Sequence, residues 1–218
     1  MPFVLDVGDR PGPARERAVT AAASAVKRGE LIVLPTESTY GISADPFSPA
    51  GIARLREAKG IGMYAPIGIL VGSPRTVNGI ASGVSAQGRA LIEAFWPGEL
   101  TLVVREQPTL AWSMGGEDGV ISVRMPLHPV ALDVLAKTGP LAVTGAQRAG
   151  ATASRTCDQA QEQFGDDVTV YLEAGPSGDG PPSTIVDITG DVPILLREGA
   201  FGLDSLRQVC ADLEGPAP

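Results

Sequence analysis

The segment Pro35–Gly41, which reads PTESTYG, is the densest group of side chains able to do chemistry. It places three aliphatic hydroxyls and one carboxylate directly after Leu31–Leu34, an apolar run that is typical of a buried strand. Ligand crevices of open α/β sheets lie at such strand ends, so these groups could bind a small polar ligand. Composition alone favours a second interpretation, a turn whose hydroxyls satisfy only nearby backbone groups.

Histidine, thiol and metal chemistry have little basis in this sequence. The chain has one histidine, His128, and two cysteines, Cys157 and Cys210, which stand far apart without a partner at metal-ligand spacing. We therefore expect no protein-held metal, ordinary buried cysteines and a reducing, cytoplasmic location. His128 precedes Pro129, so we expect it to begin a helix rather than to act as a general base.

The charge balance argues against broad nucleic-acid binding. Seventeen basic and twenty-five acidic side chains give a net charge of −8, so the field of the whole molecule repels polyanions. A nucleotide would therefore need a local cluster of arginine and lysine. The sequence also lacks an apolar run near the ~20 residues that a membrane span requires.

Helical and strand patterns alternate along the 218 residues without a repeat. Apolar residues at helical spacing predict helices at 14–28, 49–60, 86–95, 129–137, 158–164 and 204–209. Apolar runs predict strands at 31–34, 67–71, 100–104, 120–124, 141–143, 168–172, 183–188 and 194–197. This alternation predicts a mixed α/β sheet with flanking helices. We expect one domain over residues 1–212 and a short flexible tail over 213–218.

Six segments, in order along the chain, resemble sequence blocks of the YrdC-like family, the threonylcarbamoyl-AMP synthases. They are Pro35–Gly41, Lys59–Gly60 with Pro66–Ile67, Phe95–Val103, Ser122–Pro129, Pro182–Asp187 and Leu196–Ala200. The resemblance covers nearly the whole chain. It implies an α/β fold, with a twisted mixed sheet, flanking helices and an open concave cleft.

The resemblance also implies a reaction. In this family threonine takes up bicarbonate, and the resulting carboxylate attacks the α-phosphorus of ATP and expels pyrophosphate. The product, threonylcarbamoyl-AMP, later serves to modify an adenosine of certain tRNAs. ATP is thus implied as a substrate, Mg²⁺ as a bridge between its phosphates, and a downstream transferase as a partner.

Residue roles follow from the matching blocks. The resemblance assigns the amino acid to Thr36 and Ser38. It assigns the phosphates, and with them the catalytic role, to Lys59 and Arg124. Further residues are assigned to the ATP side of the site: Gly145, Gln147, Ser183, Thr184 and Arg197.

The chain departs from the family at one signature, K-x-R with S-x-N. Ile61 stands in place of the arginine, Gly145 in place of the serine and Gln147 in place of the asparagine, so that only Lys59 is retained. Ile61 cannot replace a bidentate arginine contact to phosphate. Gly145 loses a hydroxyl but allows close approach of a ligand, and Gln147 keeps an amide on a longer arm.

Three functions remain open from the sequence. The first is a threonylcarbamoyl-AMP synthase that tolerates the altered signature. The second is a paralogue that adenylates a different carboxylated substrate in a dedicated pathway. The third is a non-catalytic member that binds nucleotide or RNA in the cleft, which the net charge makes the least attractive.

Overall fold

The computed structural model describes residues 2–8, 10–112, 114–116 and 119–216. The strands are β1 (Phe3–Asp6), β2 (Ile32–Pro35), β3 (Tyr40–Ala44), β4 (Gly68–Leu70), β5 (Ala81–Ser82), β6 (Leu100–Glu106), β7 (Val120–Arg124), β8 (Leu141–Gly145), β9 (Val170–Glu173), β10 (Thr184–Asp187) and β11 (Ile194–Arg197). The α-helices are α1 (Pro13–Lys27), α2 (Pro49–Lys59), α3 (Val77–Ile80), α4 (Ala86–Phe95), α5 (Pro129–Thr138), α6 (Cys157–Phe164) and α7 (Leu203–Arg207).

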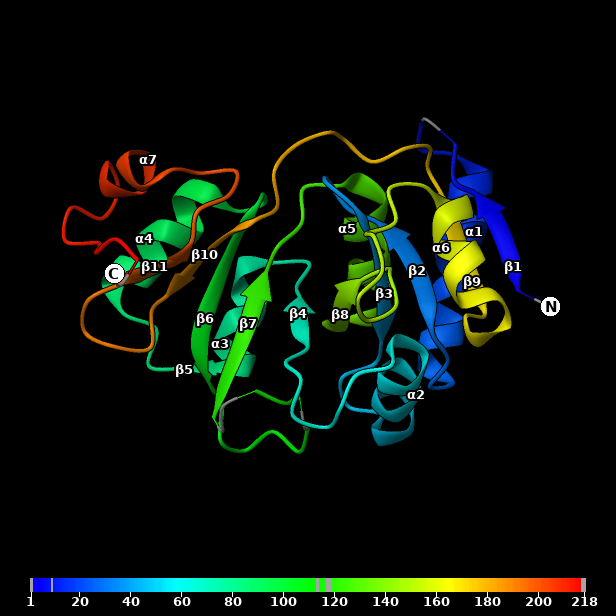
Figure 1. The fold of residues 1–218 in the computed structure, drawn as a ribbon, viewed down its shortest axis with the longest axis horizontal. Coiled ribbons are helices and arrows are strands. Elements are labelled where there is room, and N and C mark those ends of the chain that lie inside the picture. The colour runs from blue at the N-terminus through cyan, green and yellow to red at the C-terminus, as the bar shows by residue number, and fades with distance from the viewer. Residues whose placement is uncertain (1, 9, 113, 117–118, 217–218) are drawn as a thin grey trace.

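All the strands of the described residues belong to one mixed sheet (Figure 1). Its main path runs β1-β9-β2-β3-β8-β4-β7-β6-β10-β11, and β5 pairs with β6 beside that path. The sheet contains both parallel pairs, such as β4 with β7 and β6 with β10, and antiparallel pairs, such as β6 with β7. The predicted mixed α/β sheet is therefore confirmed.

Every helix and strand predicted from the sequence is present, with ends shifted by at most two residues. The prediction missed β1, β3, β5 and the short α3. β1 was missed because its apolar run, Phe3–Leu5, is only three residues long, shorter than the four to eight residues typical of a strand. β3 was missed because its first residue, Tyr40, belongs to the polar segment interpreted as a strand exit.

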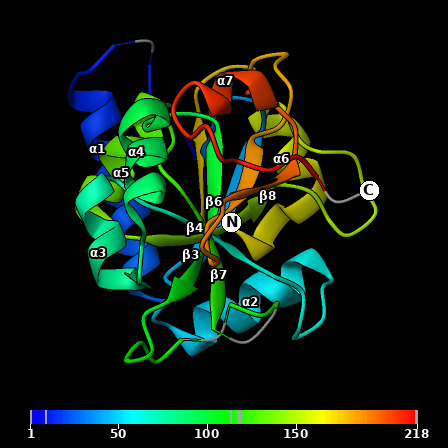
Figure 2. The same ribbon diagram turned by 90° about the vertical axis from the view of Figure 1, so that its left-hand side faces the viewer.

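The larger apolar core lies on one face of the sheet. Cross-strand partners Ala142, Ile69, Val123 and Leu102 all belong to it, and paired residues share a face. The sheet twists so strongly that this face turns over along its length (Figures 1 and 2). Helices α2 and α6 cover it in front at one end, and α3 and α4 cover it behind at the other.

The opposite face is covered at only one end. Helices α1 and α5 pack there against a second apolar cluster that includes Ile32, Leu34, Leu70 and Leu141. Where the same face turns to the front at β6 and β7, none of the described helices lies over the middle of these strands (Figure 1). This uncovered part of the sheet is the open face, where the resemblance implied a cleft.

The chain stays packed beyond residue 212. Leu213 is only 1% exposed, and Glu214 exchanges backbone hydrogen bonds with Pro193 and Leu195. Residues 213 and 214 are thus part of the domain, so any tail begins later than the sequence suggested. No helix within the described ranges is both long enough and apolar enough to cross a membrane.

Candidate functional site

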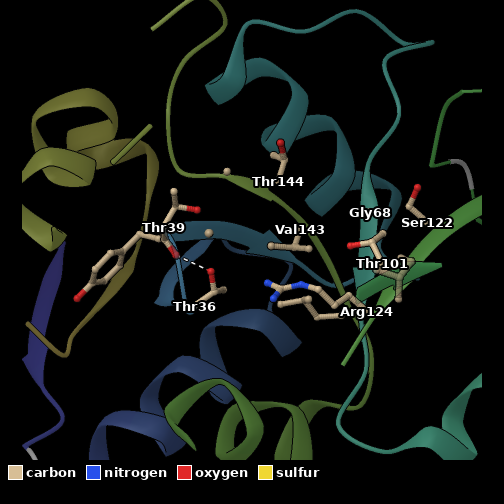
Figure 3. Close-up of a pocket in the computed structure, with 13 residues that line it drawn as sticks. Thr36, Thr39, Gly68, Thr101, Ser122, Arg124, Val143 and Thr144 are labelled. Atoms are coloured by element: carbon tan, nitrogen blue, oxygen red, sulfur yellow. Dashed lines mark hydrogen bonds between the residues drawn. The ribbon is translucent and has the colours of Figure 1, made fainter. Parts of the chain in front are cut away.

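A cavity of about 140 Å³ lies on the open face, between β3, β4, β6, β7 and β8 (Figure 3). Its lining includes one cation, Arg124, and several hydroxyl residues: Thr36, Thr39, Tyr40, Thr101, Ser122 and Thr144. This volume is below the roughly 300–1,000 Å³ of pockets that hold drug-sized ligands. The cavity therefore suits a small polar molecule and is too small for a whole nucleotide.

Glycines from three strands form the wall that gives the cavity its space. Gly41 pairs with Gly145, and Gly68 pairs with Val143, all on the open face. A Cβ added to Gly41 would lie 2.9 Å from the Val143 side chain, which is closer than real Cβ atoms approach. Side chains at these positions would therefore crowd the cavity.

Arg124 is held at the cavity by an ion pair. Its Nη1 lies 2.7 Å from Oε2 of Glu37, and both side chains are largely buried. The other oxygen of Glu37 accepts a hydrogen bond from the Leu127 N–H. Burial raises the pKa of Glu37, but Arg124 and these hydrogen bonds outweigh burial and keep it below its usual range. Glu37 thus stays ionised and orients the guanidinium toward Thr36 (Figure 3).

Thr36 fits both interpretations of its segment, the ligand site and the self-satisfied turn. Its hydroxyl donates to the Thr39 carbonyl at 2.5 Å, as expected for a self-satisfied turn. The same side chain also lines the cavity, where its oxygen can still accept a hydrogen bond. Ser38 is not part of the cavity lining.

Lys59 is the last residue of α2 and is not among the residues that line the cavity. Its ammonium donates to the carbonyl oxygen of Gly145 at 2.7 Å and to that of Gln147. Burial lowers the pKa of Lys59 to about 8. The structure therefore does not bring Lys59 and Arg124 together in one phosphate-binding cluster, and Lys59 supports the backbone of the cavity wall.

The predicted nucleotide-side residues divide into two groups. Ser183 lies next to the cavity, because its hydroxyl is 2.9 Å from that of Thr101, and Arg197 donates to the Ser183 carbonyl at 2.7 Å. Thr184, in contrast, is fully buried, and its hydroxyl bonds Phe201 and Gly199. The side chain of Thr184 thus has a structural role and is not accessible to a nucleotide.

Sequence reasoning did not assign Thr101 or Ser122 to the site. Both belong to matched blocks, and both alternate with buried apolar residues along β6 and β7. This period of two marks them as facing away from the larger core. The alternation was therefore visible in the sequence, but the strand order that turns both residues toward Arg124 was not.

The other residues singled out in the sequence have structural roles. His128 is the N-cap of α5, and its Nδ1 accepts the Val130 N–H at 3.3 Å, so the predicted helix start is confirmed. Both cysteines are free and buried, and burial raises the pKa of Cys157 to about 12.

The described residues contain no cluster of three or more His, Cys, Asp or Glu that could hold a metal ion. Glu37, the carboxylate nearest the cavity cation, is already engaged by Arg124 and Leu127. These donors do not fit a protein-held Mg²⁺. No catalytic step is therefore assigned to such a metal.

A family model described as "Telomere recombination", of the Sua5, YciO and YrdC proteins, matches residues 24–199. The chain belongs to the Sua5/YciO/YrdC family. A Mycobacterium tuberculosis relative, provisionally named threonylcarbamoyl-AMP synthase, is 45% identical over 195 residues, or 89% of this chain and 90% of the relative. The family predicted from the six blocks is thus confirmed.

Solved structures of this family share the fold. Sua5 of Pyrococcus abyssi, complexed with L-threonine, superposes with a TM-score of 0.91 over 98% of this chain, at 27% identity. This chain spans only 62% of that protein. E. coli YciO superposes with a TM-score of 0.83 over 94% of this chain and all of its own; at 20% identity it supports the fold alone.

Proposed function

We propose that this chain is a nucleotidyltransferase that forms threonylcarbamoyl-AMP from threonine, bicarbonate and ATP. The observation that carries the proposal is the small hydroxyl-lined cavity around Arg124, because its size and polarity suit an amino acid. The similarity to the threonine complex of P. abyssi Sua5 supports the same substrate class. The product would pass to a downstream transferase acting on tRNA in the cytoplasm.

The reaction needs positioning and charge neutralisation rather than a protein nucleophile. The neutral amine of the amino acid attacks the carbon of bicarbonate, and an amine proton leaves with a bicarbonate hydroxyl as water, which gives the carbamate. One oxygen of this carbamate then attacks the α-phosphorus of ATP, and pyrophosphate leaves. Arg124 would pair with a carboxylate of this intermediate, and the hydroxyls of Thr36, Thr101 and Ser122 would orient it. We assign the adjoining nucleotide to Ser183 and Arg197, next to Thr101. Any Mg²⁺ would arrive on the ATP phosphates.

Pyrophosphate release from ATP and bicarbonate tests this proposal. Each of the twenty amino acids would be supplied in turn, and the adenylate product identified by mass. We expect release above background with threonine and a product mass equal to threonylcarbamoyl-AMP. Release that depends on another amino acid, or on none, would contradict the threonine assignment.

A second candidate, a paralogue with a different carboxylated substrate, is favoured by the surroundings of the altered signature. Ile61 is partly buried and packs against the larger apolar core, so it contributes to packing where the family has arginine. The Gln147 side chain likewise occupies the space beside Gly145. Both replacements therefore fit their surroundings.

The triple variant Ile61→Arg, Gly145→Ser, Gln147→Asn separates the two candidates. A weakened threonine enzyme should gain threonine-dependent pyrophosphate release, because the variant restores a bidentate phosphate ligand. A retuned paralogue should lose activity toward its own substrate, because an arginine then replaces an apolar contact. If the triple variant gains threonine-dependent pyrophosphate release and loses activity toward no other substrate, the paralogue is ruled out.

A further inference from the structure

The segment that connects β9 to β10 passes from one side of the candidate site to the other. We call its residues 174–182 the strap. In the order of the sheet, β9 and β10 lie on either side of β3, β8, β4, β7 and β6, the strands that carry the cavity (Figure 1). The strap leads directly into Ser183, whose hydroxyl is next to that of Thr101. It therefore joins the amino-acid side of the proposed site to the nucleotide side.

The strap holds the backbone of the turn that begins at Thr36. The Gly178 N–H donates to the Glu37 carbonyl at 2.9 Å, and the Ser177 hydroxyl donates to the Thr36 carbonyl at 3.3 Å. A Cβ added to Gly178 would lie 3.1 Å from the Glu37 carbonyl oxygen, so the two backbones are in close contact. The Glu37 side chain forms the ion pair that orients Arg124. The strap thus fixes the backbone from which Glu37 reaches Arg124.

The side chain of Arg155 fastens the middle of the strap. Its guanidinium donates to the Gly178 carbonyl and lies 2.5 Å from Oδ1 of Asp179. The Arg155 carbonyl also accepts the Ser177 N–H at 2.7 Å. Arg155 lies two residues before α6, and its N–H donates to Oε1 of Gln159 in that helix at 2.8 Å. The start of α6 therefore anchors the strap through Arg155.

We propose that Arg155 is a positioning residue of the amino-acid site. It is not among the residues that line the cavity. It holds the strap, the strap holds the backbone of Thr36 and Glu37, and Glu37 holds Arg124. The effect on amino-acid binding rests on the proposed function. The link from Arg155 to Glu37 does not, and it is measurable without any ligand.

Amide hydrogen exchange of Arg155→Ala, read by mass spectrometry, tests this link. We expect faster exchange in peptides that cover residues 174–182 and 36–40, because the strap and the turn lose a shared anchor. Arg28→Ala is the matched control. Arg28 is an exposed arginine that pairs with Glu30 at 2.8 Å, outside the strap and the cavity lining, so both peptides should exchange as in the wild type. Faster exchange of the strap alone, or of neither peptide, would overturn the link.

Pyrophosphate-release kinetics with the amino acid that supports the reaction test the effect on the site. Arg155→Ala should raise the KM of the amino acid by about three- to tenfold, the effect of losing roughly one hydrogen bond. Its kcat should stay within about twofold of the wild type, since the change weakens binding and not the chemical step. Arg155→Lys keeps a cation near the Gly178 carbonyl and should recover most of the loss.

A double-variant cycle with Glu37→Gln separates positioning from a general structural effect. If Arg155 acts through the Glu37–Arg124 ion pair, Arg155→Ala should raise the KM much less when Glu37 is already glutamine. An unchanged KM, a fall in kcat alone, or an equal rise in KM in both backgrounds would overturn the proposal. If no amino acid supports release, the proposed function fails, while hydrogen exchange still decides the link from Arg155 to Glu37.

Discussion

Arg124 is the one charged side chain among the described residues that line the cavity. Its charge is partly balanced by Glu37, and the ion pair holds the guanidinium in one orientation. Such a fixed, half-neutralised arginine is suited to binding a carboxylate, because less side-chain entropy is lost when the ligand binds.

Arg124→Ala should raise the KM for the amino acid by about 10- to 100-fold, the cost of a lost charge-assisted contact. Arg105→Ala is the matched control. Arg105 is an exposed arginine on the neighbouring β6 that donates to the Thr189 carbonyl, outside the cavity lining. Steady-state kinetics check both variants, and equal KM values for Arg124→Ala and wild type would remove Arg124 from the binding site.

Lys59 should give the protein a distinctive pH dependence of stability. Burial lowers the pKa of its ammonium from 10.5 to about 8 in the folded chain. Between these pH values the unfolded chain binds a proton that the folded chain has lost, so the free energy of unfolding rises with pH. Compared with Lys59→Gln, the wild type should gain about 1 kcal/mol between pH 8 and pH 9.

Urea denaturation of both proteins at pH 8 and pH 9 measures this difference, and the comparison cancels titrations that the two proteins share. The free energy of unfolding of the wild type minus that of Lys59→Gln should therefore be larger at pH 9 than at pH 8. If this difference is constant or smaller at pH 9, burial does not lower the pKa of Lys59. The result bears directly on the cavity wall, because Lys59 holds the carbonyls of Gly145 and Gln147.

At the scale of elements, one buried hydroxyl on β10 hydrogen-bonds the turn that follows β11. The Thr184 hydroxyl donates to the Phe201 carbonyl at 2.7 Å and accepts the N–H groups of Phe201 and Gly199. A Cβ on Gly199 would lie 2.1 Å from the Pro182 carbonyl oxygen, so the two segments are in direct backbone contact. This contact keeps Ser183 and Arg197 side by side near the cavity.

Thr184→Val should therefore lower the free energy of unfolding by about 2 kcal/mol, because it keeps the shape of the side chain but leaves buried backbone groups unpaired. Thr189→Val makes the same chemical change at a partly exposed position and should cost under ~0.5 kcal/mol. Urea denaturation measures both changes. Similar losses in the two variants would show that the Thr184 hydroxyl does not fasten the turn.

At the scale of the whole molecule, the twist of the sheet creates the site. Helices α1 and α5 cover one face near β2 and β8, and the same face is uncovered at β6 and β7 (Figures 1 and 2). The cavity lies where covered and uncovered parts meet, so apolar packing supports one side and solvent reaches the other.

Residues 213 and 214 pack against the rest of the domain. Deleting residues 213–218 should lower Tm, because it removes the buried Leu213 and the backbone bonds of Glu214 to Pro193 and Leu195. Deleting only residues 215–218 should have little effect, since these bonds remain. Thermal unfolding compares the two truncations, and equal Tm values would show that residues 213–214 do not stabilise the domain.

The sequence by itself determined the element types and the family. Apolar spacing in α4 and alternation in β6 and β7 are local patterns, and local patterns suffice for helices, strands and the α/β class. The sequence blocks around Thr36 and Arg124 also predict where the cavity lies, because both residues line it.

Only the tertiary structure decided which side chains face the cavity. Lys59 and Arg124 look equivalent in the sequence, yet Arg124 lines the cavity, whereas the Lys59 ammonium bonds backbone carbonyls and Lys59 is not among the lining residues. Thr184 is buried while its neighbour Ser183 reaches Thr101. The physical reason is that the direction of a side chain depends on strand register and on the accumulated twist of the sheet, and both are set by pairings between residues far apart in the chain.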